Sequence, residues 1–180
     1  MNIISEYTMR DHILLQRALS NAVMSRDPNT KVGSVIIPAN PYMAPIHGWN
    51  RLPDNIAATH ARLHDRDTKL KLIVHAEMDA ILSAARDGIS IGGGTLYLAA
   101  TDETGEVWGG PPCTRCTVEI IQSGIKRIVS YPQKPNSKWT DDLNYARALL
   151  REAKVELIER EPLLSYIKEQ VPCISHNWRN

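Results

Sequence analysis

Short strand-like runs alternate with helix-like segments in the last two thirds of the chain, and this alternation constrains the fold most. The β-branched runs "TLYLAA", "IKRIVSY" and "KVELIE" are separated by the helical segments "CTRCTVEIIQSG" and "DDLNYARALLREA". Such alternation is typical of strands that lie parallel in one sheet and are connected by covering helices. The sequence therefore predicts an α/β fold: a single three-layer α/β/α domain with a mixed, largely parallel central sheet.

The first part of the chain adds one helix and two strands to this plan. Residues 9–25 carry apolar side chains at the three-and-four spacing of an amphipathic helix. "KVGSVIIP" predicts a buried strand and "APIHGWN" its hairpin partner, whereas the polar residues 53–73 indicate an insertion with weak helical character. A chain of 180 residues suits one domain. We expect the domain to span residues 1–160, followed by a helix and tail over 161–180.

Charge and hydropathy restrict the class of ligand. The sequence has 21 Lys and Arg against 20 Asp and Glu, a net charge of +1. No overall field would gather a polyanion, so a nucleic-acid partner is disfavoured and a small molecule is expected. The sequence has no run of 18 apolar residues and no apolar signal core at its start. These features predict a cytoplasmic protein without a membrane partner.

One histidine and two cysteines form a pattern suited to zinc. Cys113 and Cys116 share one face at the start of a predicted helix, and His75 adds an imidazole at the start of another. Three such ligands leave the fourth position of a tetrahedral ion open for water, and Glu77 is placed to move that water's proton. The alternatives are a redox pair or a closed structural zinc site, for which Cys173 is the only further cysteine. We expect one catalytic zinc ion per chain.

The combination H-x-E with P-C-x-x-C is the signature of zinc nucleobase deaminases. Through it, and through "SRDPNTKVGSVII", "GWN" and "IIQSGIKRIV", the chain resembles the cytidine/deoxycytidylate deaminase superfamily, most closely the deoxycytidylate (dCMP) deaminases. The resemblance implies a cytidine deaminase-like fold and the hydrolysis of dCMP to dUMP and ammonia. It also implies that Glu77 is the catalytic proton shuttle and that His75, Cys113 and Cys116 hold the metal.

The resemblance extends to substrate binding. Asn50, in "GWN", matches the asparagine with which the family binds the sugar, although a turn-capping amide is the alternative. Arg26 and Lys31 are the nearest candidates for a 5′-phosphate, and Arg26 is preferred for its forked guanidinium. Trp49 and Arg51 stand where the family commonly has tyrosine and glycine. Recognition of the sugar or phosphate can therefore differ from that in the plain dCMP deaminases.

Several features leave alternatives open. "TDETGEVWGG", residues 101–110, lengthens a link that helps to wall the pocket in this superfamily, and Trp108 within it can stack on a base or pack on another subunit. His60 and His64 are four residues apart and suit a second metal, although two solvated histidines are favoured. The resemblance also implies a homo-oligomer, because the relatives often form hexamers and the larger ones respond to dCTP as activator and dTTP as inhibitor. Arg86 is the candidate for such regulation, with a surface helix cation as the alternative.

Two rival functions remain at this point. One is a related deaminase that acts on a modified cytosine nucleotide, a nucleoside, guanine or a tRNA adenosine. The only dense basic run, "HARLHDRDTKLK", is interrupted by acids, which disfavours a polynucleotide substrate. The other is a non-catalytic zinc-binding regulatory module on the same scaffold. Glu77 argues against this module, because a protein without catalysis has no need of a proton shuttle.

Overall fold

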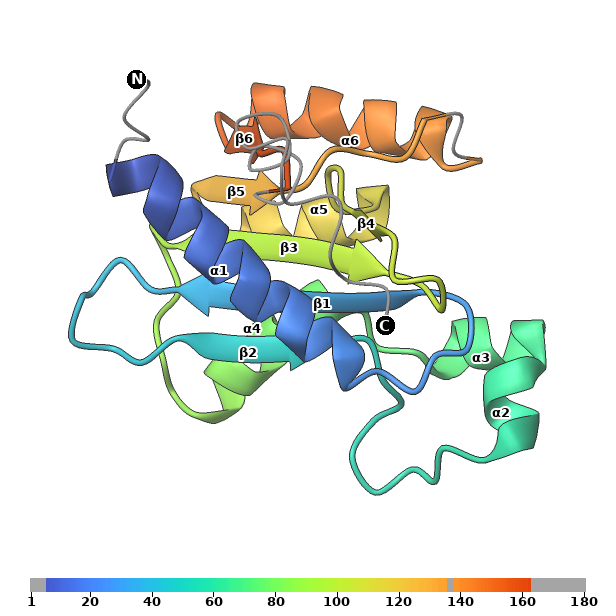
Figure 1. Cartoon of the computed structure of the whole chain (residues 1–180). Coiled ribbons are helices and arrows are strands. Elements are labelled where there is room, and N and C mark those ends of the chain that lie inside the picture. The colour runs from blue at the N-terminus through green and yellow to red at the C-terminus, as the bar shows by residue number, and fades with distance from the viewer. Residues whose placement is uncertain (1–5, 136–137, 163–180) are drawn as a thin grey trace, which may run out of the picture.

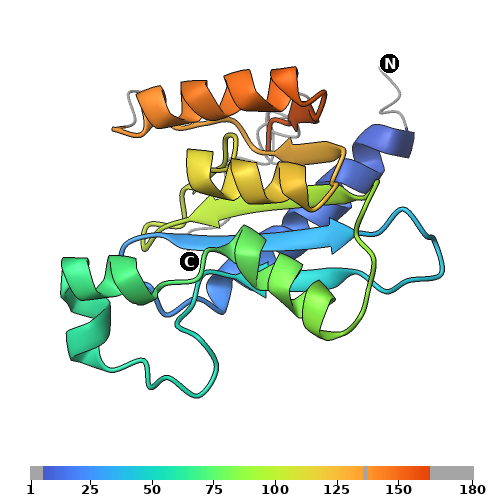
Figure 2. The same ribbon diagram turned by 180° about the vertical axis from the view of Figure 1, so that it is seen from behind.

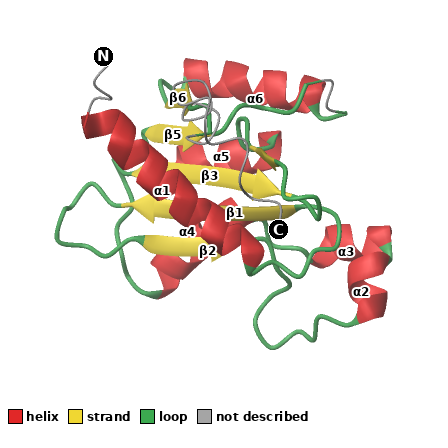
Figure 3. Ribbon diagram, viewed as in Figure 1, coloured by secondary structure: helices red, strands yellow, loops and turns green. Residues whose placement is uncertain are grey.

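A six-stranded sheet forms the centre of the molecule (Figure 3). The computed structural model describes residues 6–135 and 138–162, with side chains from residue 8 onward. The strands follow the order β2-β1-β3-β5-β6, and β4 pairs with β3. Their bounds are β1 Lys31–Ile37, β2 Ile46–Trp49, β3 Thr95–Thr101, β4 Val107–Trp108, β5 Arg127–Ser130 and β6 Glu156–Glu159.

The directions of the strands confirm the mixed, largely parallel sheet. β3 pairs in parallel with β5, and β5 with β6. β1 runs antiparallel to both β2 and β3, and β4 runs antiparallel to β3. As a result β2, β3, β5 and β6 point the same way, and their carboxyl ends meet at one edge of the sheet, where sites of α/β proteins usually form.

Helices cover both faces of the sheet and complete the three layers (Figures 1 and 2). α1, Glu6–Val23, lies alone across one face. α4, Ala76–Arg86, α5, Thr114–Gln122, and α6, Thr140–Glu152, lie on the other. No helix in the described part of the chain is both long enough and apolar enough to span a membrane.

Two apolar clusters hold the layers together. One joins the sheet to α4 and α5 through Ile36, Leu96 and Ile120, and the other joins it to α1 through Leu15 and Tyr97. Close approach of the helices depends on glycine in the strands. A Cβ atom on Gly33 would lie 2.0 Å from the carbonyl oxygen of Ala18 in α1, so any side chain there would push α1 off the sheet.

The insertion predicted over residues 53–73 contains two short helices, α2 His60–His64 and α3 Arg66–Leu72. It is tied to the loop after α1 by a buried ion pair, in which Lys69 Nζ lies 3.0 Å from Asp27 Oδ1. The segment 101–110, expected to be a loop, contains the short strand β4. The helix and tail expected over residues 161–180 lie outside the described residues from 163 onward.

Candidate active site

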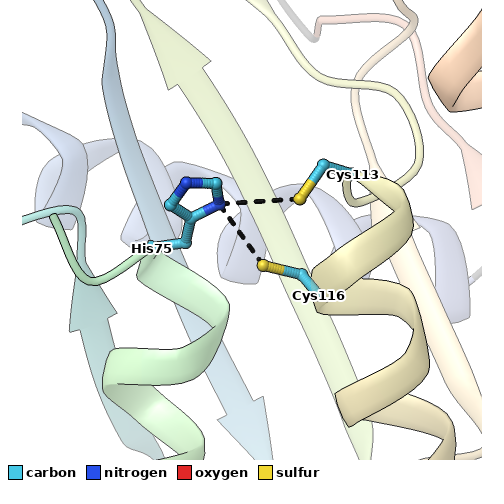
Figure 4. A group of neighbouring side chains, drawn as sticks. All are labelled: His75, Cys113 and Cys116. Atoms are coloured by element: carbon cyan, nitrogen blue, oxygen red, sulfur yellow. Dashed lines mark hydrogen bonds between the residues drawn. The ribbon is translucent and has the colours of Figure 1, made fainter. Parts of the chain in front are cut away.

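The starts of two neighbouring helices bring the expected metal ligands together. His75 is the N-cap of α4, and Cys113 is the N-cap of α5. His75 Nδ1 lies 3.3 Å from Cys116 Sγ and 3.6 Å from Cys113 Sγ (Figure 4). The three ligand atoms are within 4.8 Å of one another, and no other such group of at least three potential ligands occurs in residues 6–135 and 138–162.

The chemistry of the three donors fits zinc. One imidazole nitrogen and two sulfur atoms are borderline-soft ligands, and a set of three leaves room for a water or substrate atom on a four-coordinate ion. Helix α5 fixes the positions of Cys113 and Cys116 relative to each other, because one is its N-cap and the other is in its first turn. His75, Cys113 and Cys116 are thus the residues that would hold the ion.

A metal ion that bound to this cluster would displace protons from it. The Cys116 thiol donates to Cys113, and with the imidazole of His75 it lowers the pKa of Cys113 to about 4. The same hydrogen bond raises the pKa of Cys116, since the two sulfur atoms share one proton. The bond to Cys113 also raises the pKa of His75 to about 9. Metal ligands must be deprotonated, so Cys116 and His75 are the two ligands that would lose a proton when zinc bound.

Glu77 lies beside the ligands and is shielded from water. It is in the first turn of α4 and only 4% exposed. Burial raises the pKa of Glu77 to about 7, although the charge of His75 partly offsets this rise. This charge interaction places the carboxyl close to the cluster. A buried acid beside an open metal position is suited to proton transfer.

Asp142 holds the start of the cysteine helix, a role that no pattern in the sequence indicates. Its carboxylate accepts a hydrogen bond from the Thr114 amide at 3.0 Å, and its carbonyl accepts one from the Thr114 hydroxyl, also at 3.0 Å. Cys113 itself makes no side-chain cap for α5. Asp142 in α6 therefore supplies the cap, and an acid there suits the positive end of the α5 dipole.

Asp79 and Arg51 tie the first turn of α4 to the end of β2. The backbone of Arg51 pairs with that of Val74, with bonds of 3.0 and 2.8 Å, directly before His75. Arg51 Nε donates to Asp79 Oδ1 at 2.8 Å, and the guanidinium also binds Asp54 and lies 5.2 Å from the centre of the Trp49 ring. Arg51 thus holds α4 against the end of β2.

Asn50 is buried and uses its side chain to fix the backbone. Its Oδ1 accepts from the Val32 amide at 2.8 Å, and its Nδ2 donates to the Thr30 carbonyl at 2.9 Å. These bonds give Asn50 a structural role, because they hold the residue after β2 against the start of β1 and the residue before it. Since an amide nitrogen carries two hydrogens, a second donor remains for another acceptor.

The two basic candidates occupy different surroundings. Arg26 is exposed and lines a surface cavity of about 430 Å³ together with Trp49, Arg51 and Asp54. The residues around this cavity include none of the metal ligands. Lys31 is half-buried, and its Nζ donates to the Ser25 carbonyl at 3.1 Å. The structure brings neither cation into contact with the metal cluster.

The remaining candidates lie on the surface. The rings of His60 and His64 are exposed and stacked with their centres 3.7 Å apart, and His64 Nδ1 is 3.0 Å from the His60 carbonyl. This arrangement is that of two solvated histidines. Arg86 is 61% exposed and pairs with Asp54 at 3.3 Å and Asp87 at 3.8 Å.

The fold and the site together define a zinc-dependent deaminase of the nucleobase type. In such proteins one histidine and two cysteines hold the metal, and a glutamate beside them moves the proton. The family model of the cytidine and deoxycytidylate deaminase zinc-binding region matches residues 8–131, and the chain belongs to this family. The resemblance in the sequence and the expectation of zinc are thereby confirmed.

Individual relatives agree with this assignment. The chain is 28% identical to the deoxycytidylate deaminase of Homo sapiens over 155 residues, 83% of this chain and 79% of the human protein. It is 37% identical to that of Enterobacteria phage T4 over 93 residues, 51% of this chain and 42% of the phage protein. A crystal structure of dCMP deaminase from cyanophage S-TIM5, in complex with dCMP and dUMP, has a TM-score of 0.63 at 19% identity and covers 88% of this chain and 100% of its own. That likeness shows a shared fold.

Proposed function

We propose that the protein converts dCMP to dUMP with release of ammonia. The observation that carries this proposal is the burial of Glu77 beside His75, Cys113 and Cys116, because proton transfer at a metal site is what hydrolytic deamination requires. The similarity to several deoxycytidylate deaminases supports the choice of substrate within the family.

The roles of the residues follow from their positions. Bound zinc supplies Lewis acidity, which makes water a nucleophile at neutral pH. Glu77 moves a proton from water to N3 of the cytosine and later protonates the amino group that leaves as ammonia. Its burial favours this exchange over exchange with bulk solvent. His75, Cys113 and Cys116 hold the metal in place throughout.

We assign recognition of the nucleotide to residues after α1, at the start of β1 and after β2. We assign the second amide hydrogen of Asn50 to a sugar hydroxyl, since the first is used by the Thr30 carbonyl. Arg26 is the first candidate for the 5′-phosphate because its guanidinium is exposed, and Lys31 is the second. Arg51 is left out of this set because Asp54, Asp79 and Trp49 already surround its guanidinium.

We also propose that the protein is a cytoplasmic homo-oligomer. More specifically, we propose a hexamer that is regulated by dCTP and dTTP. The outer faces of α4 and α5 support assembly, since Leu82 is 53% exposed and Val118 is 54% exposed. Arg86 is the candidate for effector binding, although its pairing with Asp54 and Asp87 suits a surface cation equally. Light scattering combined with rates measured with each triphosphate tests both points.

An ammonia-release assay over dCMP, dCTP, deoxycytidine, cytosine and guanine tests the substrate. We expect dCMP to have the highest kcat/KM. A higher value for another member of the set would reassign the protein within the family. A zinc-loaded protein that releases no ammonia from any of them, or from a modified cytosine nucleotide or a tRNA adenosine, would refute the proposal.

A further inference from the structure

The segment 101–110 carries Trp108 onto the face of the sheet that bears the metal ligands. In the pairing of β3 with β4, Trp108 is opposite Ala100 and Val107 is opposite Thr101. Val107 packs into the apolar cluster beneath α1. Because neighbouring residues of a strand point to opposite faces, Trp108 points to the face covered by α4 and α5. His75 and Cys113 lie at the starts of these helices.

Two glycines then bind the segment to the end of β5. The Gly109 amide donates to the Pro132 carbonyl at 2.9 Å, and the Gly110 amide donates to the Tyr131 carbonyl at 2.7 Å. A Cβ atom on Gly109 would lie 2.5 Å from the Tyr131 oxygen, so only glycine permits this approach. The chain continues from here through two prolines to Cys113. The position of Trp108 is thereby linked to that of a metal ligand.

The ammonium group of Lys134 contacts three side chains of the segment 101–110. Lys134 Nζ lies 2.7 Å from Glu106 Oε2 and 3.0 Å from Asp102 Oδ2, and 3.8 Å from the centre of the Trp108 ring. Glu106 and Asp102 together raise the pKa of Lys134, so the group is a cation throughout the physiological range. Three contacts of one ammonium, two ionic and one with an aromatic face, join the segment to the chain after β5.

We propose that Lys134 is a positioning residue that fixes Trp108 as one wall of the nucleotide pocket. This inference rests on the proposed function for the identity of the ligand. Without the ammonium, Asp102 and Glu106 would repel each other and the ring would lose its partner, so the segment would open away from the metal cluster. Trp108 offers a flat apolar face that suits a pyrimidine ring.

Kinetics of Lys134→Met test this role, because methionine keeps much of the length of the side chain and removes its charge. We expect the KM for dCMP to rise about tenfold while kcat stays within about twofold, since the loss affects the pocket wall and not the proton path. Zinc content should remain that of the unmodified protein, and Lys134→Arg should restore most of the affinity. Lys126→Met, an exposed lysine before β5, is the matched control. An unchanged KM in Lys134→Met, or loss of zinc from it, would overturn the proposal.

A second measurement does not depend on turnover. Hydrogen–deuterium exchange of residues 101–110 should be faster in Lys134→Met than in the unmodified protein or in Lys126→Met. Addition of dCMP to the Glu77→Gln protein should change the tryptophan fluorescence, and Trp108→Phe in that background should remove most of the change. If the unmodified protein deaminates no cytosine nucleotide, the proposed function fails, but accelerated exchange still supports the anchoring by Lys134. Unchanged exchange refutes that anchoring even in an active enzyme.

Discussion

His75 Nδ1 lies 3.3 Å from Cys116 Sγ although 41 residues separate them along the chain. The contact exists because α4 and α5 start side by side at the same edge of the sheet, each directly after a ligand at its N-cap. A metal bound by both helices therefore links two elements that the backbone connects only through β3 and the segment 101–110. Binding energy at this point also stabilises the packing of the two helices.

The first prediction concerns metal content. Elemental analysis should give about one zinc per chain, because three ligands of suitable chemistry meet at one place. Cys113→Ala, Cys116→Ala and His75→Ala should each lose the metal and the activity. His60→Ala and His64→Ala are the controls and should change neither. Two zinc ions per chain, with one lost in the His60 or His64 variant, would show that the stacked pair is a second site.

The second prediction concerns the support of the cysteine helix. Asp142→Ala removes the acceptor of the Thr114 amide and should lower the free energy of unfolding by about 1 kcal/mol, the usual effect of losing a helix cap. Because α5 carries both cysteines, zinc affinity should fall as well. Asp141→Ala, at the exposed neighbouring position, is the matched control. Equal zinc affinities in the two variants, measured by competition with a chelator, would exclude this role for Asp142.

The third prediction concerns stability at low pH. Asp11 is 1% exposed and binds Arg127 at 2.9 Å and Arg160 at 3.0 Å. Burial alone would raise the pKa of Asp11, but hydrogen bonds from Arg127, Arg160 and Tyr97, together with the charge of Arg127, give a net lowering. A lowered folded-state pKa means that the carboxylate stabilises the protein above its unfolded-state pKa of about 4, and that this contribution disappears as the pH falls through the folded-state value.

Asp11→Asn should therefore destabilise the protein by about 3 kcal/mol at pH 7, because two guanidiniums lose their buried partner. The difference from the unmodified protein should shrink as the pH falls below about 4. Denaturant unfolding at a series of pH values measures both effects, and Asp67→Asn, at an exposed position, is the control. A difference that stays constant from pH 7 to pH 3 would mean that the charge of Asp11 is not what stabilises the fold.

Local signals in the sequence were sufficient to predict the layers of the fold and to select the three residues that the structure brings together as candidate metal ligands. The alternation of β-branched runs with amphipathic segments predicts the order of strands and helices, because it reflects burial on two faces of one sheet. His75, Glu77, Cys113 and Cys116 could be selected together because their spacing within each helix start has a direct chemical meaning. Neither prediction depends on contacts between segments that are distant in the sequence.

The supports of the site could not be predicted because they depend on such contacts. Asp142 caps a helix that starts 28 residues earlier in the chain, and nothing in "TDDL" distinguishes it from Asp141. Lys69 lies in a polar insertion, where a lysine is usually solvated, but in the structure it is buried and pairs with Asp27. The bonds of Asn50 to Thr30 and Val32 depend on how the end of β2 meets the start of β1, and no pattern in the sequence indicates this contact.

The last prediction separates the metal ligands from the proton path. Glu77→Gln nearly preserves the shape of a side chain that is 4% exposed, and Glu77 is not one of the three ligand residues. Zinc content and fold should therefore be retained. An amide neither accepts the proton from water nor delivers one to N3, so kcat for dCMP should fall by about 10²- to 10⁴-fold while dCMP still binds.

His75→Ala is the contrasting variant, because it removes a metal ligand and should lose zinc together with activity. Zinc analysis, equilibrium binding of dCMP and ammonia release on the same preparations distinguish the two cases. If Glu77→Gln released ammonia at close to the normal rate, Glu77 would be only a buried helix residue, and the proton would have to travel by another group. If it lost zinc as His75→Ala does, Glu77 would be supporting the metal site, and the loss of activity would carry no information on proton transfer.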